Sequence, residues 1–288
     1  MSFSVQDLVK LLQVERLDEF RFQGESPMQG TPRVYGGQIV AQAIMAMGRT
    51  VREEHNLHSM QAYFLRPGDI TKHIIFNIQP VRDGRSFSTR SLLAWQGDKL
   101  IFQASASFQA KEGDHERFRS MPAVSTPDSL ESEEDFFARQ APPDADSPRF
   151  YAPFFMSLFE RRSEHWRRLE RPGQRAPANG IWCRLREPVA NDPLLHQALI
   201  AYLSDLDLMY TAMRPRAIAA LDPSAHAASL DHVMWFHQPA RADEWFYYDL
   251  DGPCATNNRG LGAGAIYQNN RLAVTAMQEG LLRVATST

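Results

Sequence analysis

The stretch NDPLLHQALIAYLSDLDLMY, residues 191 to 210, decides the fold of this chain. Asn191 or Asp192 can cap a helix, and Pro193 fits its first position because a missing N–H costs nothing there. Apolar residues then recur at helical spacing and form one stripe: Leu195, Ala198, Leu199, Tyr202, Leu206 and Met209. The spacing predicts a single buried helix over 191–210.

Asp205 lies inside that apolar stripe. A carboxylate on the buried face of a helix costs free energy unless it is paired, hydrogen-bonded or protonated. The stripe alone is compatible with a structural carboxylate that caps or pairs a neighbour, and equally with a functional one. Both interpretations stay open at this point.

A second buried helix is predicted in VYGGQIVAQAIMAM, residues 34 to 47. Apolar residues occupy nearly all of its sides, which is typical of a helix wrapped by a sheet. Gly36 and Gly37 open the helix and allow another group to approach its N-terminus, where N–H groups favour a negative charge or a polarised carbonyl. Tight helix–strand packing explains the two glycines equally well.

Strand-like segments surround both helices, separated by turn signals containing Gly, Pro or Asp. We expect strands at 20–24, 59–66, 74–82, 86–96, 100–109, 154–162, 181–186, 229–237, 244–250, 259–268 and 272–284. A short amphipathic helix is expected at 4–17. Runs of strands that follow a helix indicate an α+β fold with antiparallel sheets, not an alternating βαβ one.

Two pairs of segments repeat at one offset. YFLRP at 63–67 matches WFHQP at 235–239, an offset of 172 (235 − 63), and WQGDKL at 95–100 matches YQNNRL at 267–272 at the same offset (267 − 95). This indicates a duplicated unit, and the free edge of one copy's sheet can pair with the other copy. The two copies differ where the second has the polar residues Asp205, Ser229 and Gln278 opposite Ala46, Leu57 and Ala106. Polar groups in one copy suggest one working site per chain, although packing could also place them there.

The chain divides into an N-terminal unit at 1–115, a connecting segment at 116–147 and a C-terminal unit at 148–288. Several prolines punctuate the connecting region, and its acidic run from Asp128 to Asp135 is typical of a solvated face or loop.

Composition excludes several classes of protein. Of the 288 residues, 43% are hydrophobic and 23% charged, and the net charge is −3, so a general nucleic-acid or anionic-membrane surface is not indicated. No apolar run is long enough to insert into a membrane, and the N-terminus does not resemble a signal peptide. The two cysteines give no disulfide framework and favour a cytoplasmic location, and the scattered histidines lack the spacing of a metal site.

Ordered motifs across nearly the whole chain resemble the type II acyl-CoA thioesterases. They are VYGGQIVAQA at 34–43, HS at 58–59, YFLRPGD at 63–69, RDGRSFS at 82–88, ASASFQ at 104–109, LSDL at 203–206, LDHVMWFH at 230–237 and QEG at 278–280. The resemblance implies a double hot-dog fold, in which two antiparallel sheets each wrap a long central helix. It also implies an enzyme that hydrolyses fatty acyl-CoA to a free fatty acid and CoA, with no cofactor.

The catalytic set that the resemblance implies is Asp205, Ser229 and Gln278, which hold the attacking water, with Asp205 as general base. Threonine is frequent in the family at the position of Ser229, and serine keeps the hydroxyl. Hot-dog sheets commonly pair between chains, so a homo-oligomer, dimer or tetramer, is expected. Arginines near strand ends are candidates for contacts with CoA phosphates, but solvated surface roles are favoured for them: Arg66, Arg82 and Arg85.

Two alternatives remain at this stage. A hot-dog enoyl-CoA hydratase typically uses an Asp with a His five residues later, and Tyr210 stands at that position after Asp205. A non-catalytic acyl-CoA-binding hot-dog protein is disfavoured by the acid–hydroxyl–amide set. An α/β-hydrolase is excluded by the missing GxSxG motif.

Overall fold

The computed structural model describes residues 3–27, 33–113, 115–139, 151–164, 166, 179–214 and 225–284. Within them lies one 13-stranded sheet whose paired strands are all antiparallel, in the order β1-β2-β4-β5-β6-β3-β10-β13-β12-β11-β8-β7, with β9 also paired to β13. No helix in these residues is long and apolar enough to span a membrane.

The first half of the sheet comes from the N-terminal part of the chain. Its elements are α1 (Val5–Leu12), β1 (Glu15–Arg16), β2 (Arg21–Gly24), α2 (Gly36–Gly48), β3 (His55–Phe64), β4 (Ile74–Asp83), β5 (Phe87–Gln96) and β6 (Lys99–Ala110). The connecting region holds the 3-10 turn η1 (Pro127–Ser129) and α3 (Glu133–Ala138).

The second half repeats this plan with additions. Its elements are α4 (Tyr151–Leu158), β7 (Phe159–Arg162), β8 (Asn179–Leu185), α5 (Pro193–Ser204), α6 (Leu208–Met213), β9 (Ala225–Ser229), β10 (Asp231–Phe236), β11 (Phe246–Thr256), β12 (Arg259–Gln268) and β13 (Arg271–Val284).

The two halves join where β3 pairs with β10. In this pairing Tyr63 lies opposite Asp231, and Ser59 lies opposite Trp235. Position 235 is the repeat equivalent of 63 (63 + 172), and position 231 is the repeat equivalent of 59 (59 + 172). The two pairs therefore join equivalent positions with the halves exchanged, which is the two-fold symmetry expected of two copies that meet edge to edge. The two sheets predicted from the sequence are therefore one continuous sheet.

The repeated WQGDKL and YQNNRL turns are alike in structural detail. Both hairpins carry a register shift at the same relative position, before Trp95 in one and before Tyr267 in the other. The Gln96 side chain bonds to the backbone N–H and carbonyl of Asp69, and Gln268 does the same with Arg241, again 172 positions on (241 − 69).

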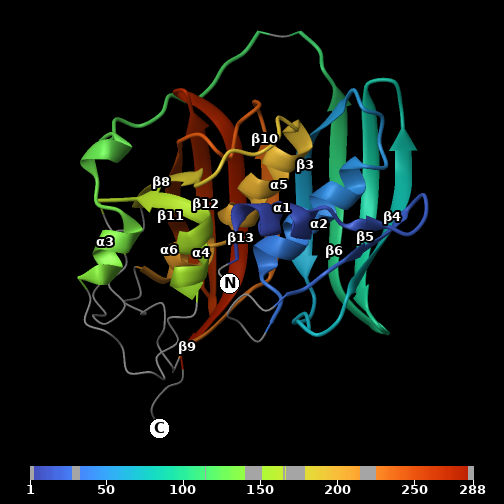
Figure 1. The fold of residues 1–288 in the computed structure, drawn as a ribbon, viewed down its shortest axis with the longest axis horizontal. Helices are drawn as coiled ribbons and strands as arrows, with labels where there is room; N and C mark the ends of the chain where they lie inside the picture. The colour runs from blue at the N-terminus through green and yellow to red at the C-terminus, as the bar shows by residue number, and fades with distance from the viewer. Residues whose placement is uncertain are drawn as a thin grey trace.

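The helices α2 and α5 lie side by side in front of the middle of the sheet (Figure 1). They run antiparallel, because the N-terminal Gly37 of α2 meets the C-terminal Tyr202 of α5, and Gly48 at the other end of α2 meets Leu194. Residues 37–47 of α2 are all buried, as the apolar pattern predicts. Pro193 begins α5, and the Asp192 carboxylate caps it by accepting from Leu194 N–H at 2.9 Å.

Four of the predicted elements differ from the structure. The helix predicted over 191–210 ends at Ser204, and α6 begins after a turn. The strand predicted over 154–162 is helical up to Leu158, and the one over 229–237 is broken at Leu230. The N-terminal helix also stops at Leu12, because Glu15 and Arg16 pair with β2 instead.

Replacing Gly37 with alanine should destabilise the protein. A Cβ at this position would lie 2.2 Å from the backbone carbonyl oxygen of Tyr202, which cannot move away as a flexible side chain could. Overpacking of this kind costs about 1–3 kcal/mol, and we expect that loss in the free energy of unfolding measured by urea denaturation.

Gly113→Ala is the matched control, since no atom lies within 4 Å of a Cβ built there. It should change the free energy of unfolding by no more than about 0.5 kcal/mol. Equal effects of the two substitutions would show that the α2–α5 contact is not tight.

Candidate active site

Asp205 lies at the point where α5 ends. Ser204 and Asp205 are residues whose side chains compete with the helix for backbone hydrogen bonds, which favours termination here. The last carbonyls of α5 are bound by side chains: Tyr35 Oη donates to the Tyr202 carbonyl at 2.8 Å, and Tyr248 Oη donates to the Ser204 carbonyl at 3.1 Å. These bonds fix the turn, so that Asp205 caps the helix and does not continue the stripe.

The Asp205 carboxylate lies against the N-terminus of α2, which belongs to the other half of the sheet. A Cβ on Gly36 would lie 2.6 Å from Asp205 Oδ2, and the backbone of Gly37 hydrogen-bonds to the carboxylate. The glycines therefore place helical N–H groups at a carboxylate, as one explanation expected. The tight packing that they allow is mostly against the end of α5, whereas the other explanation expected packing against a strand.

Gln278 reaches the same carboxylate from β13. Its side chain is fully buried, and its Nε2 donates to Asp205 Oδ1 and lies 3.2 Å from His232 Nδ1. Its Oε1 is buried and has no hydrogen-bond partner among the residues that the structure describes. An amide oxygen in that condition is suited to accept a hydrogen bond from a bound molecule.

The environment of Asp205 tunes its acidity. Burial raises the pKa of Asp205 to about 6, although the hydrogen bonds from Gln278 and from the Gly37 backbone act to lower it. A carboxyl group with a pKa near neutrality can accept a proton and release it again, as a general base must.

Ser229 lies at the end of β9, half-buried and opposite Gly280 of β13. Gly280 and Gln278 share one face of β13, because side chains two residues apart point the same way. No hydrogen bond joins the Ser229 hydroxyl to another described residue. The structure thus brings Asp205 and Gln278 into contact and puts Ser229 on the adjacent strand.

His232 was not among the site residues expected from the sequence, where it was one of the scattered histidines without metal-site spacing. His232, Met234 and Phe236 share the buried face of β10, and a histidine among apolar residues on such a face was the available signal. Its Nε2 lies 2.9 Å from Ser204 Oγ, so this ring connects Gln278 to the end of α5.

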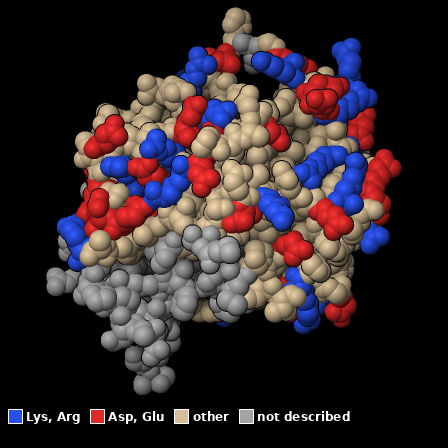
Figure 2. Space-filling model, in the orientation of Figure 1, with Lys and Arg blue, Asp and Glu red and all other residues tan. Residues whose placement is uncertain are grey.

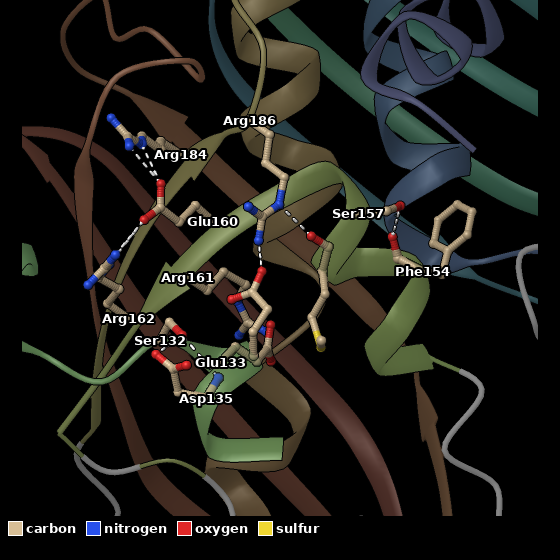
Figure 3. Close-up of polar contacts among 12 residues, drawn as sticks. Ser132, Glu133, Asp135, Phe154, Ser157, Glu160, Arg161, Arg162, Arg184 and Arg186 are labelled. Carbon is tan, nitrogen blue, oxygen red and sulfur yellow. Dashed lines mark hydrogen bonds and ion pairs between the residues drawn. The ribbon is translucent and has the colours of Figure 1, made fainter. Parts of the chain in front are cut away.

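A buried ion cluster supports the turn that carries Asp205. Arg161 of β7 binds Glu133 through Nη1 at 2.6 Å and Asp207 through Nη2, and all three side chains are almost fully buried. Figure 3 shows Arg161 and Glu133 close together, with α3 directly below them. Glu133 therefore contradicts the expectation that the whole run from Asp128 to Asp135 is solvated.

Neither surface charge nor possible metal ligands single out another site among the described residues. Basic and acidic side chains are interspersed over the face seen in Figure 2, with no broad field of one sign. Within the described residues, no group of three or more His, Cys, Asp or Glu side chains could hold a metal ion.

Comparisons with known proteins find similar sequences over nearly the whole chain. A family model described as acyl-CoA thioesterase matches residues 152–281, and one described as the acyl-CoA thioesterase N-terminal domain matches residues 22–109. The chain is 34% identical over 289 residues to acyl-CoA thioesterase 2 of Haemophilus influenzae, covering 98% of this chain and 99% of the relative. It is 34% identical over 290 residues to human acyl-coenzyme A thioesterase 8, covering 95% and 88%.

Solved structures show the same architecture. The acyl-CoA thioesterase II TesB2 of Mycobacterium marinum superposes with a TM-score of 0.79 at 32% identity, covering 97% of this chain and 99% of that one. A hot-dog protein from Alicyclobacillus acidocaldarius gives a TM-score of 0.75 at 16% identity, covering 97% and 98%, which supports a hot-dog fold alone.

Arg161→Met should destabilise the protein by about 3–5 kcal/mol, because it removes the cation that binds two buried carboxylates, Glu133 and Asp207. Urea denaturation measures this loss. Arg184→Met is the control: Arg184 is 41% exposed in its ion pair with Glu160, and its loss should cost no more than about 1 kcal/mol. Similar losses in both variants would contradict a special role for the buried cluster.

Proposed function

The chain belongs to the acyl-CoA thioesterase family and hydrolyses the thioester bond of acyl-CoA, and from that premise we propose that Asp205 is the general base of the reaction. The observation that carries the proposal is the buried contact between Asp205 and Gln278 at the glycine N-terminus of α2. Burial raises the pKa of Asp205 to about 6, and the carboxyl group lies next to an amide oxygen that has no partner among the described residues.

In the proposed reaction, Asp205, Ser229 and Gln278 hold one water molecule. Asp205 takes a proton from the water as the water oxygen attacks the thioester carbonyl carbon. The tetrahedral intermediate then collapses, the carbon–sulfur bond breaks, and the leaving CoA thiolate takes the proton from Asp205, which restores the carboxylate. General-base catalysis accounts for roughly 10²–10⁴-fold of the acceleration, so positioning and carbonyl polarisation must supply the rest.

The N-terminus of α2 is the proposed source of that polarisation. Its first N–H groups and its dipole already act on the Asp205 carboxylate. A thioester carbonyl brought within reach of the same water would lie in the same field, where developing negative charge is stabilised.

The finer architecture is part of this proposal. Residues 1–115 and 148–288 would be two hot-dog units of a double hot-dog fold, with α2 and α5 as their central helices and 116–147 as the connection. The symmetric β3–β10 junction and the repeated hairpins support it. We further propose a fatty acyl chain as substrate, bound between helix and sheet, a cytoplasmic location and a homo-oligomeric state.

Asp205→Asn should lower kcat by about 10²–10⁴-fold, because the amide cannot accept the proton of the attacking water. The measurement is release of free thiol from a panel of acyl-CoAs, short to long, with wild type alongside.

Asp249→Asn controls for loss of a partly buried carboxylate elsewhere, since burial also raises the pKa of Asp249 on β11. It should keep wild-type kcat. Near-normal thiol release by Asp205→Asn would remove Asp205 as the base and leave the activity standing.

The pH dependence of kcat/KM should follow the ionisation of Asp205. Only the carboxylate accepts a proton, so kcat/KM should fall about tenfold per pH unit below the pKa of about 6 and level off above it. Phosphate groups also ionise near pH 6, so the profile should be repeated with an acyl-pantetheine thioester that lacks them. A flat profile with this substrate would argue against Asp205 as the titrating base.

A further inference from the structure

His232 lies on the buried face of β10, beside the contact between Asp205 and Gln278. Its ring is almost completely buried, with Nδ1 3.2 Å from Gln278 Nε2 and Nε2 2.9 Å from Ser204 Oγ. The ring therefore links the amide of Gln278 to the last residue of α5. The reaction proposed above assigns no part to it.

The hydrogen bonds around Ser204 decide which ring nitrogen carries the proton. Ser204 Oγ lies 2.9 Å from the carbonyl oxygen of Ala201. In a longer helix the N–H of Asp205 would donate to that carbonyl, but it donates to Leu203 instead. The hydroxyl of Ser204 therefore donates to Ala201, a stronger acceptor than the Met234 sulfur 3.7 Å away. Its oxygen then accepts from the Nε2–H of His232.

With its proton on Nε2, His232 presents a lone pair at Nδ1, and the Gln278 amide must turn its NH₂ group toward it. One N–H faces His232 and the other donates to Asp205. The amide oxygen is thereby directed away from both, into the position where it has no partner among the described residues. We infer that His232 is a positioning residue, which holds the Gln278 amide so that its oxygen accepts a hydrogen bond from the attacking water.

Asp205 alone cannot hold the Gln278 amide in this orientation through the whole reaction, because Asp205 gains a proton during the proposed step. A carboxylate requires the NH₂ group beside it, but a protonated acid can donate to the oxygen of a flipped amide. His232 opposes the flipped amide in both states, since its lone pair would then face an oxygen. Burial lowers the pKa of His232 to about 4, so the ring stays neutral while Asp205 titrates.

This inference rests on the proposed function, because it needs a water beside Asp205. That water would donate one hydrogen bond to Asp205 and the other to Gln278 Oε1. The Ser229 hydroxyl would donate to one of its lone pairs, and the second lone pair would face the thioester carbonyl. A freely rotating amide would present its NH₂ group to the water part of the time, and in that orientation it could not accept the hydrogen bond that positions the water.

The first test is a pair of substitutions at one position. His232→Leu removes the acceptor and should lower kcat by about tenfold to a hundredfold with little change in KM, because the interaction serves the reacting water and not substrate binding. His232→Asn places an amide oxygen close to the position of Nδ1 and should retain kcat within about threefold of wild type. Equal losses in both variants would overturn the inference.

A control isolates the effect of losing a buried histidine. His55 is also buried and hydrogen-bonded, to Ser88 Oγ at 2.9 Å and to the Arg85 carbonyl at 3.0 Å, but it belongs to β3 of the first half. His55→Leu should lower the denaturation midpoint and leave the kcat of the folded enzyme unchanged. A drop in kcat as large as that of His232→Leu would mean that a purely structural loss explains both.

A double-mutant cycle separates this inference from the proposed function. If His232 acts through Gln278, adding His232→Leu to Gln278→Ala should lower kcat no further. If the kcat losses of the two single variants multiply in the double variant, the inference is overturned, while Gln278 keeps its place in the site. Wild-type kcat in Gln278→Ala alone would overturn the proposed function and the inference with it.

The tautomer of His232 can be measured in the wild-type protein. In ¹⁵N-labelled wild-type enzyme, the ring resonances of His232, assigned by their loss in His232→Asn, should show protonated Nε2 and unprotonated Nδ1 at neutral pH. A ring protonated at Nδ1 would reverse the amide of Gln278 and overturn the inference.

Discussion

The contact of the N-terminus of α2 with the C-terminus of α5 is the constraint on which the rest of the structure depends. It brings helical N–H groups from one half of the sheet to a buried carboxylate from the other. Neither half alone contains both partners. A side chain at Gly36 or Gly37 would separate the two ends, so the backbone itself must make the contact.

Two-fold symmetry would give this contact twice, but the residues present make it only at one end of the helix pair. The junction of β3 and β10 is two-fold, so the antiparallel helices α2 and α5 meet at two equivalent ends. At the other end, Gly48 packs against the apolar side chain of Leu194, and the residue of the first half that falls opposite Asp205 is the apolar Ala46. The two equivalent ends thus differ in chemistry, and the polar residues at one of them support the proposal of a single site per chain.

The sequence predicted those features of the fold that depend on local pattern. Strand alternation, turn residues and the helix start at Pro193 all follow from short-range chemistry, and the structure has them. The break after Ser204 could not be read from the apolar stripe, since Leu206 and Met209 continue it. That break depends on Tyr35 and Tyr248, hydroxyl donors distant in sequence that bind carbonyls at the end of α5. His232 was missed for the same reason, because only the fold places Gln278 and Ser204 on its two nitrogens.

Burying the Asp205 carboxylate has an energetic cost that other parts of the chain must offset. Burial disfavours its charged form, so the carboxylate weakens the folded state as pH rises from its unfolded value of 3.8 through about 6. The turn that carries Asp205 therefore needs support from elsewhere in the chain, and the buried ion pair of Arg161 with Asp207 provides it. Since Arg161 also binds Glu133 of α3, the segment between the two halves is part of what holds the carboxylate in place. The connection is then a structural element of the site, and not only a tether between two copies.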